Sequence, residues 1–323
     1  MRAQDSESLF RTPVDVGNPQ RPIGVGDTNV FLGSCFAENV GRRFADARLH
    51  VLVNPLGVLY NPVIIGTLLY PRLPIDAHLF VQNNGMWHTW LGDTSLSRLS
   101  QDECERVTRE AVDTLQGTMA KADNLFLTLG TSRCYNLVDG DDTVANCHRM
   151  PADTFWTMDV LPEGLEECLG GALDEWHLWN PRLQVIITIS PFRYAKYGMH
   201  GSQLDKARLL LGVERMMQTR ADWMCYFPAY EIVMDELRDY RFYADDMLHP
   251  SQQAVDYIWQ RLQDGWMTDE LRHYLRRWDP VGRALAHRPL HPESPEYETF
   301  QERTREQLQQ LQRDYPMLAI TGN

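Results

Sequence analysis

Apolar side chains along this chain follow two kinds of pattern. In residues 124–130 and 183–190 they succeed one another with little polar interruption, and each run ends at a small residue. Runs of this length are typical of strands buried on both faces of a parallel sheet. Shorter apolar runs at 30–33, 50–53 and 224–228 predict three further strands.

A four-residue spacing of apolar side chains predicts the helices. Phe36, Val40 and Phe44 lie on one helical face, and residues 102–122 show the same spacing. We predict further helices at 63–69, 160–179, 202–220 and 230–237, and one that begins after Ser251, a preferred N-cap residue. Because strands and helices alternate, we expect an α/β fold with a mainly parallel sheet covered on both faces.

The remaining segments show weaker patterns. Residues 1–29 contain three prolines and three glycines, which predicts an irregular leader wrapping the sheet edge. Residues 71–100 are less regular, and residues 140–148 indicate a turn and a short strand. Beyond Pro280 the sequence becomes polar. We therefore predict a main domain, residues 1–279, and a polar C-terminal helical extension, residues 280–323, docked on that domain or on a partner chain.

Composition excludes several classes of function. The 323 residues carry a formal net charge of -13, which disfavours nucleic acid and anionic membranes as partners. We find neither a transmembrane run nor a signal-peptide pattern, so we expect a cytoplasmic protein. The six cysteines are scattered without a CxxC spacing, which predicts reduced thiols. Motifs for nucleotide phosphates and for zinc are absent, so we expect no metal and no cofactor.

Ser34 follows Gly33 at the junction of a predicted strand and a predicted helix. A hydroxyl there stands at the carboxyl end of a strand, where open α/β sheets bind ligands. It also lies beside the unpaired N–H groups of a helix N-terminus, which favour negative charge. Two interpretations stay open, a nucleophile or a simple N-cap residue. We interpret the next residue, Cys35, as a small buried hydrophobe.

Asp246 and His249 supply the partners that a serine nucleophile needs, a base and a group that orients it. Residues three apart in a tight turn can bring a carboxylate against an imidazole. Asp246 would then hold one ring nitrogen of His249, and His249 would take the proton of Ser34. Asp245 is an alternative orienting residue, and an ordinary loop cap before the helix is the structural alternative.

Six strings of residues, in this order, resemble one known family. They are GSCFA at 33–37, NPLGVLYNP at 54–62, TLGT at 128–131, ANCH at 145–148, SPFR at 190–193 and DMLHP at 246–250. Together they resemble the GSCFA family, which is named for the first string and is related to the SGNH/GDSL hydrolases. The resemblance implies an SGNH-hydrolase-like three-layer α/β/α sandwich whose catalytic residues are Ser34, Asp246 and His249.

An acyl-transfer site also needs donors for the oxyanion. The backbone N–H of Ser34 is one candidate, and Gly57 is a second, because glycine lets the backbone approach a ligand. SGNH hydrolases complete the hole with an asparagine in their third block, and this chain has none after Gly130. Gly130, Thr131 or Asn61 could replace it. Ordinary turn geometry is the alternative interpretation of the two glycines.

Three further residues are candidates for substrate binding. Arg193 follows the clearest strand and could hold an anionic group, or it could tie its loop by a salt bridge. His148 could contact substrate or pack structurally. His88 lies between two tryptophans that could form a sugar-binding wall or a small packing cluster.

These residues and the resemblance predict an esterase that cleaves an acyl ester through an acyl-serine intermediate at Ser34. The related hydrolases imply O-acetyl groups on a carbohydrate as the substrate class to test first. The alternatives are an acyltransferase with the same triad and a non-catalytic binding module, which the missing asparagine favours. We expect a small-molecule or carbohydrate ester as partner, no nucleic acid and no membrane, and the C-terminal helix leaves a homo-oligomer open.

Overall fold

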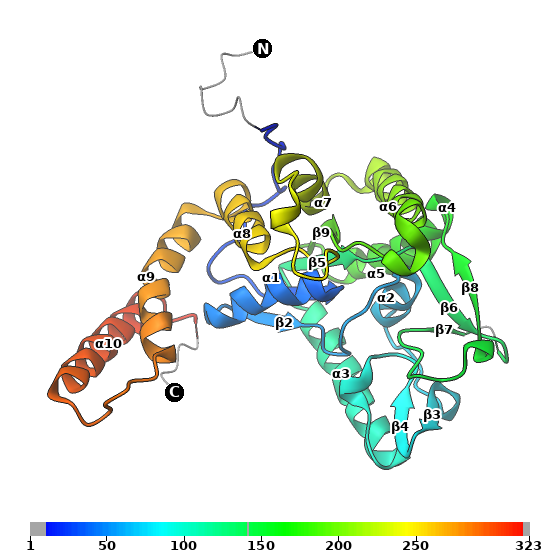
Figure 1. The fold of residues 1–323 in the computed structure, drawn as a ribbon, viewed down its shortest axis with the longest axis horizontal. Helices are drawn as coiled ribbons and strands as arrows, with labels where there is room; N and C mark the ends of the chain where they lie inside the picture. The colour runs from blue at the N-terminus through cyan, green and yellow to red at the C-terminus, as the bar shows by residue number, and fades with distance from the viewer. Residues whose placement is uncertain (1–10, 141, 319–323) are drawn as a thin grey trace.

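The central feature of the computed structural model is a sheet of five parallel strands in the order β10-β9-β5-β1-β2 (Figure 1). The structure describes residues 11–140 and 142–318. The strands are β1 (Asn29–Gly33), β2 (Val51–Val53), β5 (Asn124–Leu129), β9 (Gln184–Ile189) and β10 (Met224–Tyr226). Each coincides with a predicted apolar run, so the patterns located the whole central sheet.

Neighbouring residues of each strand enter opposite hydrophobic cores. Phe31 of β1 stacks on Phe126 of β5, with ring centroids 4.2 Å apart, on the side covered by α1 (Cys35–Asp46) and α8 (Gln252–Trp266). Leu32 and Leu127 belong to the other core. That core is covered by α2 (Pro62–Leu69), α3 (Gln101–Met119), α5 (Gly171–Trp179) and α6 (Gly198–Arg220). The predicted three-layer α/β/α sandwich is confirmed.

Two of the predicted helices change their winding along their length. The segment predicted as 160–179 consists of α4 (Pro162–Leu165), a π-helical turn at Glu166–Gly170 and then α5. The segment predicted as 230–237 begins as α7 (Ala229–Glu231) and continues as a second π-helical turn, Ile232–Glu236. Apolar spacing predicts where a helix lies, but it does not predict these local insertions.

Two small antiparallel sheets were not predicted as such. The irregular stretch 71–100 contains a hairpin of β3 (Phe80–Asn83) and β4 (Met86–Thr89). A three-stranded sheet joins β6 (Arg133–Leu137), β7 (Thr143–Val144) and β8 (Phe155–Asp159). These strands are short and partly exposed, so their apolar pattern is weaker than that of the central strands.

The described part of the leader runs along the amino ends of the central strands. The side chain of Gln20 donates a hydrogen bond to the carbonyl of Met224 at 2.8 Å, and the N–H of Arg21 donates to the side chain of Gln184 at 2.8 Å. Ile23 donates its N–H to the carbonyl of Trp266. The leader therefore covers the amino edge of the sheet and leaves the carboxyl edge open. Residues 1–10 of the predicted leader lie outside the described residues.

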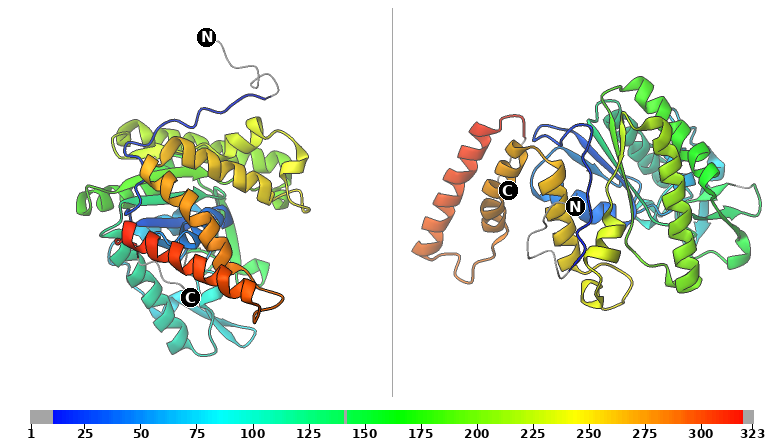
Figure 2. Two further views of the ribbon diagram at one scale, coloured as in Figure 1. Left: turned by 90° about the vertical axis from the view of Figure 1, so that its left-hand side faces the viewer. Right: turned by 90° about the horizontal axis from the view of Figure 1, so that it is seen from above.

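The C-terminal helices α9 (Asp269–Ala286) and α10 (Pro295–Asp314) lie side by side at one end of the molecule (Figure 2). The Tyr274 hydroxyl donates to the carbonyl of Ala47 at 2.6 Å, and the Trp278 indole donates to the carbonyl of Asp46 at 2.8 Å. The first part of α9 therefore docks on the end of α1, and the predicted extension reaches the main domain where the carbonyl of Met317 contacts the His50 ring nitrogen at 2.8 Å. The predicted boundary at residue 280 falls inside α9, which continues through Pro280.

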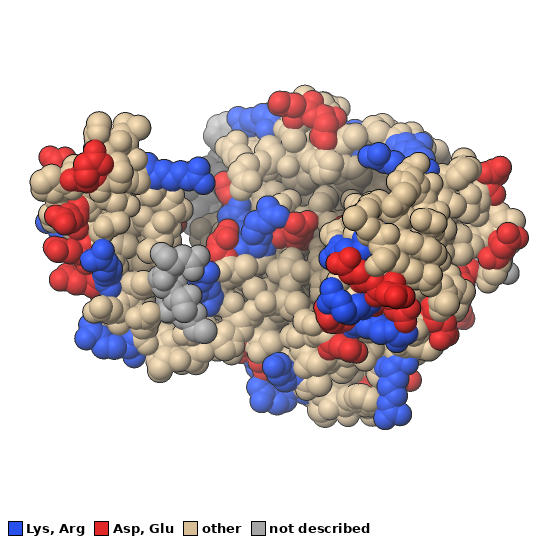
Figure 3. All heavy atoms as spheres, turned by 90° about the horizontal axis from the view of Figure 1, so that it is seen from below, with Lys and Arg blue, Asp and Glu red and all other residues tan. Residues whose placement is uncertain are grey.

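Charged side chains are distributed over the surface in small groups of both signs on the face shown in Figure 3. Within the described part of the chain, no helix is both long enough and apolar enough to cross a membrane. The same residues contain no group of three or more His, Cys, Asp or Glu side chains placed to hold a metal ion.

Candidate active site

The turn between β1 and α1 is fixed by close contact with β5. Gly33 has φ +128°, and a Cβ on this residue would lie 2.1 Å from the carbonyl oxygen of Thr128, so only glycine fits. The side-chain oxygen of Asn54 accepts the N–H of Gly33 at 2.9 Å. The carbonyl of Gly33 accepts the N–H of Leu59 at 2.9 Å. The residue that follows, Ser34, is thereby held in one position.

Ser34 is the N-cap residue of α1 and is only 1% exposed. Its Oγ accepts the N–H of Phe36 at 3.3 Å, and its own N–H donates to the carbonyl of Thr128 at 3.1 Å. The hydroxyl therefore has the capping role that the sequence left open. The cap uses an oxygen lone pair, so the O–H proton remains available to a base.

Cys35 is the first residue of α1 and is only partly buried, whereas the sequence predicted a small buried hydrophobe. Burial raises the pKa of its thiol, the Glu38 carboxylate acts in the same direction, and the charge of Lys206 opposes both. The thiol also interacts with Tyr60 and Tyr194. Of the two side chains at this junction, that of Cys35 is the more accessible.

Lys206, on α6, is a buried cation that the sequence analysis missed. Its Nζ donates to the carbonyl of Gly130 at 2.6 Å and lies 5.9 Å from the centre of the Tyr194 ring. Burial lowers the pKa of its amine to about 8, although the adjacent Asp205 carboxylate opposes the shift. No sequence signal marks this residue, because a lysine in an amphipathic helix ordinarily faces solvent.

Asp246 and His249 form the pair that their spacing predicted. The Asp246 Oδ2 and the His249 Nδ1 are 2.6 Å apart. The other carboxylate oxygen accepts the N–H groups of Leu248 and His249 at 2.8 and 2.9 Å. These three contacts lower the pKa of Asp246 to about 2. Both side chains are about half exposed, so the imidazole is open to solvent. Asp245 makes no contact with His249 among the described residues.

Two residues that follow β9 hold the loop that carries this pair. Arg193 donates its backbone N–H to the carbonyl of Leu248 at 3.1 Å and its guanidinium to that of Met247 at 3.2 Å. The Phe192 ring packs against the His249 ring, with centroids 4.3 Å apart. Arg193 therefore ties the loop, as one of its two interpretations proposed, but through carbonyl groups and not through a salt bridge.

The predicted oxyanion donors are all engaged within the chain. Gly130 and Thr131 both donate their N–H groups to the carbonyl of Tyr60, at 3.1 and 3.0 Å. The Thr131 hydroxyl bonds Asp205, and Gly57 donates its N–H to the carbonyl of Asn54. Like these, the N–H of Ser34 is already bonded, to Thr128 as described above.

Asn61, the last of these candidates, is an N-cap residue. Its side-chain oxygen accepts the N–H of Ile64 at 2.9 Å, and its amide nitrogen donates to the carbonyl of Val144 at 3.3 Å. Gly57 is required for packing as well, because a Cβ there would lie 2.0 Å from the Asp93 carboxyl carbon. In this conformation the backbone N–H groups of the other four candidates are all bonded, and one of the two amide N–H groups of Asn61 is bonded to Val144.

His148 and His88 pack against each other, with ring centroids 4.5 Å apart. The His148 Nε2 contacts the carbonyl of Thr89 at 2.8 Å, and burial lowers the pKa of the ring. His88 bonds the Ser97 hydroxyl at 2.7 Å. Both histidines are buried. They therefore stabilise the β3–β4 hairpin. For both histidines this agrees with the interpretation as a packing residue and not with the one as a substrate-binding residue.

The β1–α1 turn and the Asp246 loop both lie at the carboxyl edge of the sheet. A row of aromatic rings connects them. The Phe192 ring packs against the His249 ring. The ring centroid of Tyr194 lies 4.9 Å from that of Phe192, and the ring centroid of Tyr60 lies 6.2 Å from that of Tyr194. No hydrogen bond joins His249 to Ser34 or Cys35 among the described residues. The structure thus brings Asp246 and His249 into contact, and among the described residues neither side chain is hydrogen-bonded to a candidate nucleophile.

The sequence model of the GSCFA family matches residues 29–262, which is more than half of the chain. The chain belongs to the GSCFA family. A second sequence model, described as the C-terminal domain of GSCFA domain proteins, matches residues 278–321. No curated protein matches the sequence. The five residues that give the GSCFA family its name, Gly33 to Ala37, form the turn after β1 and the start of α1.

Proposed function

We propose that this GSCFA-family chain is an acyl hydrolase related to the SGNH hydrolases and that it cleaves an ester. The Asp246–His249 pair carries the proposal, because a 2.6 Å contact between a carboxylate and Nδ1 fixes the tautomer that leaves Nε2 as a base. The half-exposed imidazole can reach a bound ester. The helix N-terminus at the β1–α1 turn favours the negative charge that develops during attack.

The reaction has two balanced halves. His249 takes the proton of the nucleophile, which attacks the ester carbonyl, and then returns this proton to the alcohol as the carbon–oxygen bond breaks. An acyl-enzyme remains. Water, deprotonated by His249, attacks this intermediate and releases a carboxylic acid, and the proton returns to the nucleophile. Asp246 stabilises the imidazolium in both halves.

Two neighbouring side chains are candidates for the nucleophile. Ser34 is the residue that the family resemblance indicates, but its hydroxyl is 1% exposed and caps α1. Cys35 is more exposed, but burial and the Glu38 carboxylate raise the pKa of its thiol, and the positive charge of Lys206 opposes this shift only in part. Accessibility therefore favours Cys35, which would make the intermediate a thioester. An ester of a carbohydrate stays the substrate class to test first.

A second candidate function is a non-catalytic binding module. The observation that favours it is the engagement of all five predicted oxyanion donors with partners inside the chain. A module of this kind would bind a ligand at the carboxyl edge without turnover. The six free cysteines support a reducing compartment for either function, and we propose a cytoplasmic location.

Hydrolysis of p-nitrophenyl acetate by the purified full chain tests the proposal. We expect turnover by the wild type and loss of about 10²–10⁴-fold in kcat/KM for His249→Ala. Asp245→Asn, on the neighbouring carboxylate, serves as the matched control and is expected to keep full activity. Ser34→Ala and Cys35→Ala identify the nucleophile, because only one of them should abolish formation of the acyl-enzyme seen by intact mass.

Two outcomes would overturn the acyl hydrolase. One is a folded wild type that neither hydrolyses the ester nor acquires an acyl group, which would favour the binding module. The other is hydrolysis that persists unchanged in His249→Ala, which would assign the activity to nonspecific surface groups. Addition of an acceptor alcohol separates hydrolysis from transfer, because a transferase would form a new ester.

A further inference from the structure

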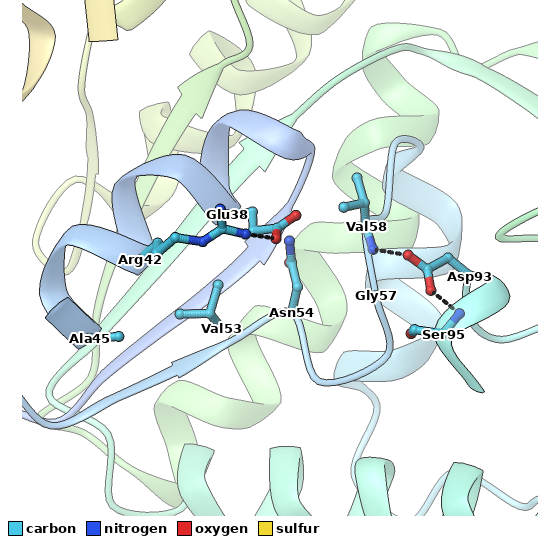
Figure 4. A pocket seen from close by; sticks show the side chains of 9 residues that line it. All are labelled: Glu38, Arg42, Ala45, Val53, Asn54, Gly57, Val58, Asp93 and Ser95. Atoms are coloured by element: carbon cyan, nitrogen blue, oxygen red, sulfur yellow. Dashed lines mark hydrogen bonds and ion pairs between the residues drawn. The ribbon is translucent and has the colours of Figure 1, made fainter. Parts of the chain in front are cut away.

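A pocket of about 380 Å³ lies beside the β1–α1 turn and is lined by none of the residues discussed as nucleophile or base. Glu38 and Arg42 of α1 line one side, Asn54 lies in the middle, and Val58, Asp93 and Ser95 line the other side (Figure 4). We call it the Asn54 pocket. Its volume falls in the range of small-molecule sites.

Asn54 provides an independent sign that this pocket binds a ligand. The residue is 9% exposed, and its amide Nδ2 has no hydrogen-bond partner among the described residues. The orientation of the amide is fixed, because Oδ1 accepts the N–H of Gly33 and the nitrogen must point the other way. Figure 4 shows this nitrogen directed towards the Glu38 carboxylate. A buried donor without a partner is unfavourable, and a ligand acceptor would satisfy it.

The charged groups of the pocket restrict the ligand further. Glu38 is paired with Arg42 at 2.5 Å, and Asp93 accepts the N–H groups of Val58 and Ser95 at 2.9 and 2.8 Å. Two carboxylates and one guanidinium leave a net negative charge, which disfavours an anion. The carboxylates accept hydrogen bonds, whereas Asn54 donates one. A ligand that offers both donors and acceptors without charge fits this set, and hydroxyl groups do so.

The pocket is also connected to the candidate active site. Asn54 bonds the residue that precedes Ser34, and the N–H of Glu38 donates to the carbonyl of Ser34 at 3.3 Å. A ligand held here would therefore lie one helical turn from the nucleophile. Val53, Val58 and Ala45 add apolar surface, which suits the C–H face of a sugar ring.

We propose that the Asn54 pocket binds an uncharged, hydroxyl-rich ligand, a sugar, and that this ligand is the alcohol part of the ester. Only the claim that this ligand is the alcohol part of the ester rests on the proposed function, since binding of a sugar does not require turnover. Asn54 donates to a ring or hydroxyl oxygen, and Glu38 and Asp93 accept from hydroxyl groups.

Saturation-transfer NMR with the methyl glycosides of glucose, galactose, mannose and xylose tests the proposal. We expect at least one glycoside to bind with a dissociation constant of about 1 mM and glucuronate to bind more weakly. Ala45→Trp places a bulky ring at the exposed rim and should abolish the signal. Ala286→Trp, at an equally exposed helical alanine on α9, is the matched control and should bind as the wild type does.

Glu38→Gln tests the proposed acceptor, and we expect at least a tenfold loss of affinity. Glu110→Gln, which changes the carboxylate of an exposed ion pair on α3 that does not line the pocket, is the matched control and should retain binding. His249→Ala should also retain binding, because His249 does not line the pocket, so failure of the esterase and failure of the sugar site are distinguishable. Absence of binding to all four glycosides, or equal binding by Ala45→Trp and Ala286→Trp, would overturn the proposal.

Discussion

Gly33 lies so close to the backbone of Thr128 that a methyl group on Gly33 would stand 2.1 Å from the Thr128 carbonyl oxygen. Because φ of Gly33 is +128° as well, both space and backbone conformation demand glycine. We expect Gly33→Ala to destabilise the protein by about 3 kcal/mol or more. Urea unfolding followed by circular dichroism measures the loss.

Gly117→Ala is the matched control. Gly117 lies inside α3 with ordinary helical geometry, and a Cβ there would meet nothing within 4 Å. Alanine should stabilise that helix by about 0.5–1 kcal/mol. If both variants changed the stability alike, the steric argument for the β1–α1 turn would be wrong.

Removal of the N-cap should cost stability independently of any catalytic role. Ser34→Ala deletes the acceptor of the Phe36 N–H, and we expect a loss of about 1 kcal/mol in the free energy of unfolding. Ser34→Thr keeps a hydroxyl oxygen and should recover most of it. Thermal and urea unfolding of the two variants provide the comparison, and an unchanged stability for Ser34→Ala would contradict the capping role.

Asp246→Asn tests whether the negative charge of Asp246 is needed in addition to its contact with the His249 ring. The pKa of Asp246 is lowered to about 2 by its contacts with His249 and Leu248, so the carboxylate is ionised throughout the pH range of an esterase assay. The amide cannot stabilise the imidazolium, and we expect kcat/KM to fall about 10²–10⁴-fold. Asp245→Asn controls for the loss of one negative charge in the loop. Equal rates for the two variants would show that Asp245, or neither residue, orients His249.

Lys206 should impose a pH dependence on stability. Its folded-state pKa, about 8, lies below the ordinary value for lysine, so the folded state binds this proton less tightly than the unfolded state. The lowered pKa therefore reduces the free energy of unfolding by about 3 kcal/mol below pH 8, and this reduction disappears as the pH rises towards 10.5.

Comparison of the wild type with Lys206→Met isolates this effect, because the raised tyrosine pKa values act in the opposite direction in both proteins. We expect the difference in unfolding free energy to shrink between pH 8 and 10.5. Since Lys206→Met also breaks the bond to Gly130 and could fail to fold, lysine side-chain NMR of the wild type gives a direct check. A midpoint near pH 10.5 for Lys206 would refute the prediction.

The sequence predicted the central sheet because its strands are buried on both faces. In β5 and β9 every side chain is buried and four of the six in each strand are apolar, so the pattern needs no tertiary information. The hairpin of β3 and β4 was missed because each strand has only four residues and their burial does not alternate: Phe80 is the buried residue of β3, and His88 and Thr89 are those of β4. Short strands of this kind are defined by their partners across the hairpin, which a linear pattern does not reveal.

In the candidate site, too, local contacts were predictable from the sequence and contacts between distant segments were not. Asp246 and His249 were predictable because a contact over three residues is local. The partners of Gly130 and Thr131 were not, because the carbonyl of Tyr60 that binds them lies far away in the sequence. The burial of Lys206 and the unpaired amide of Asn54 also depend on how distant segments pack.

Tyr274 and Trp278 connect the C-terminal helices to α1, whose opposite end carries the candidate nucleophiles. These two side chains bind the last carbonyl groups of that helix, at Ala47 and Asp46. The helix is therefore clamped at its far end by one part of the chain while the turn at Gly33 holds its near end. An exchange of α9 and α10 between relatives would thus not be modular, because the substituted helices would have to be refitted to the helix that presents Ser34 and Cys35.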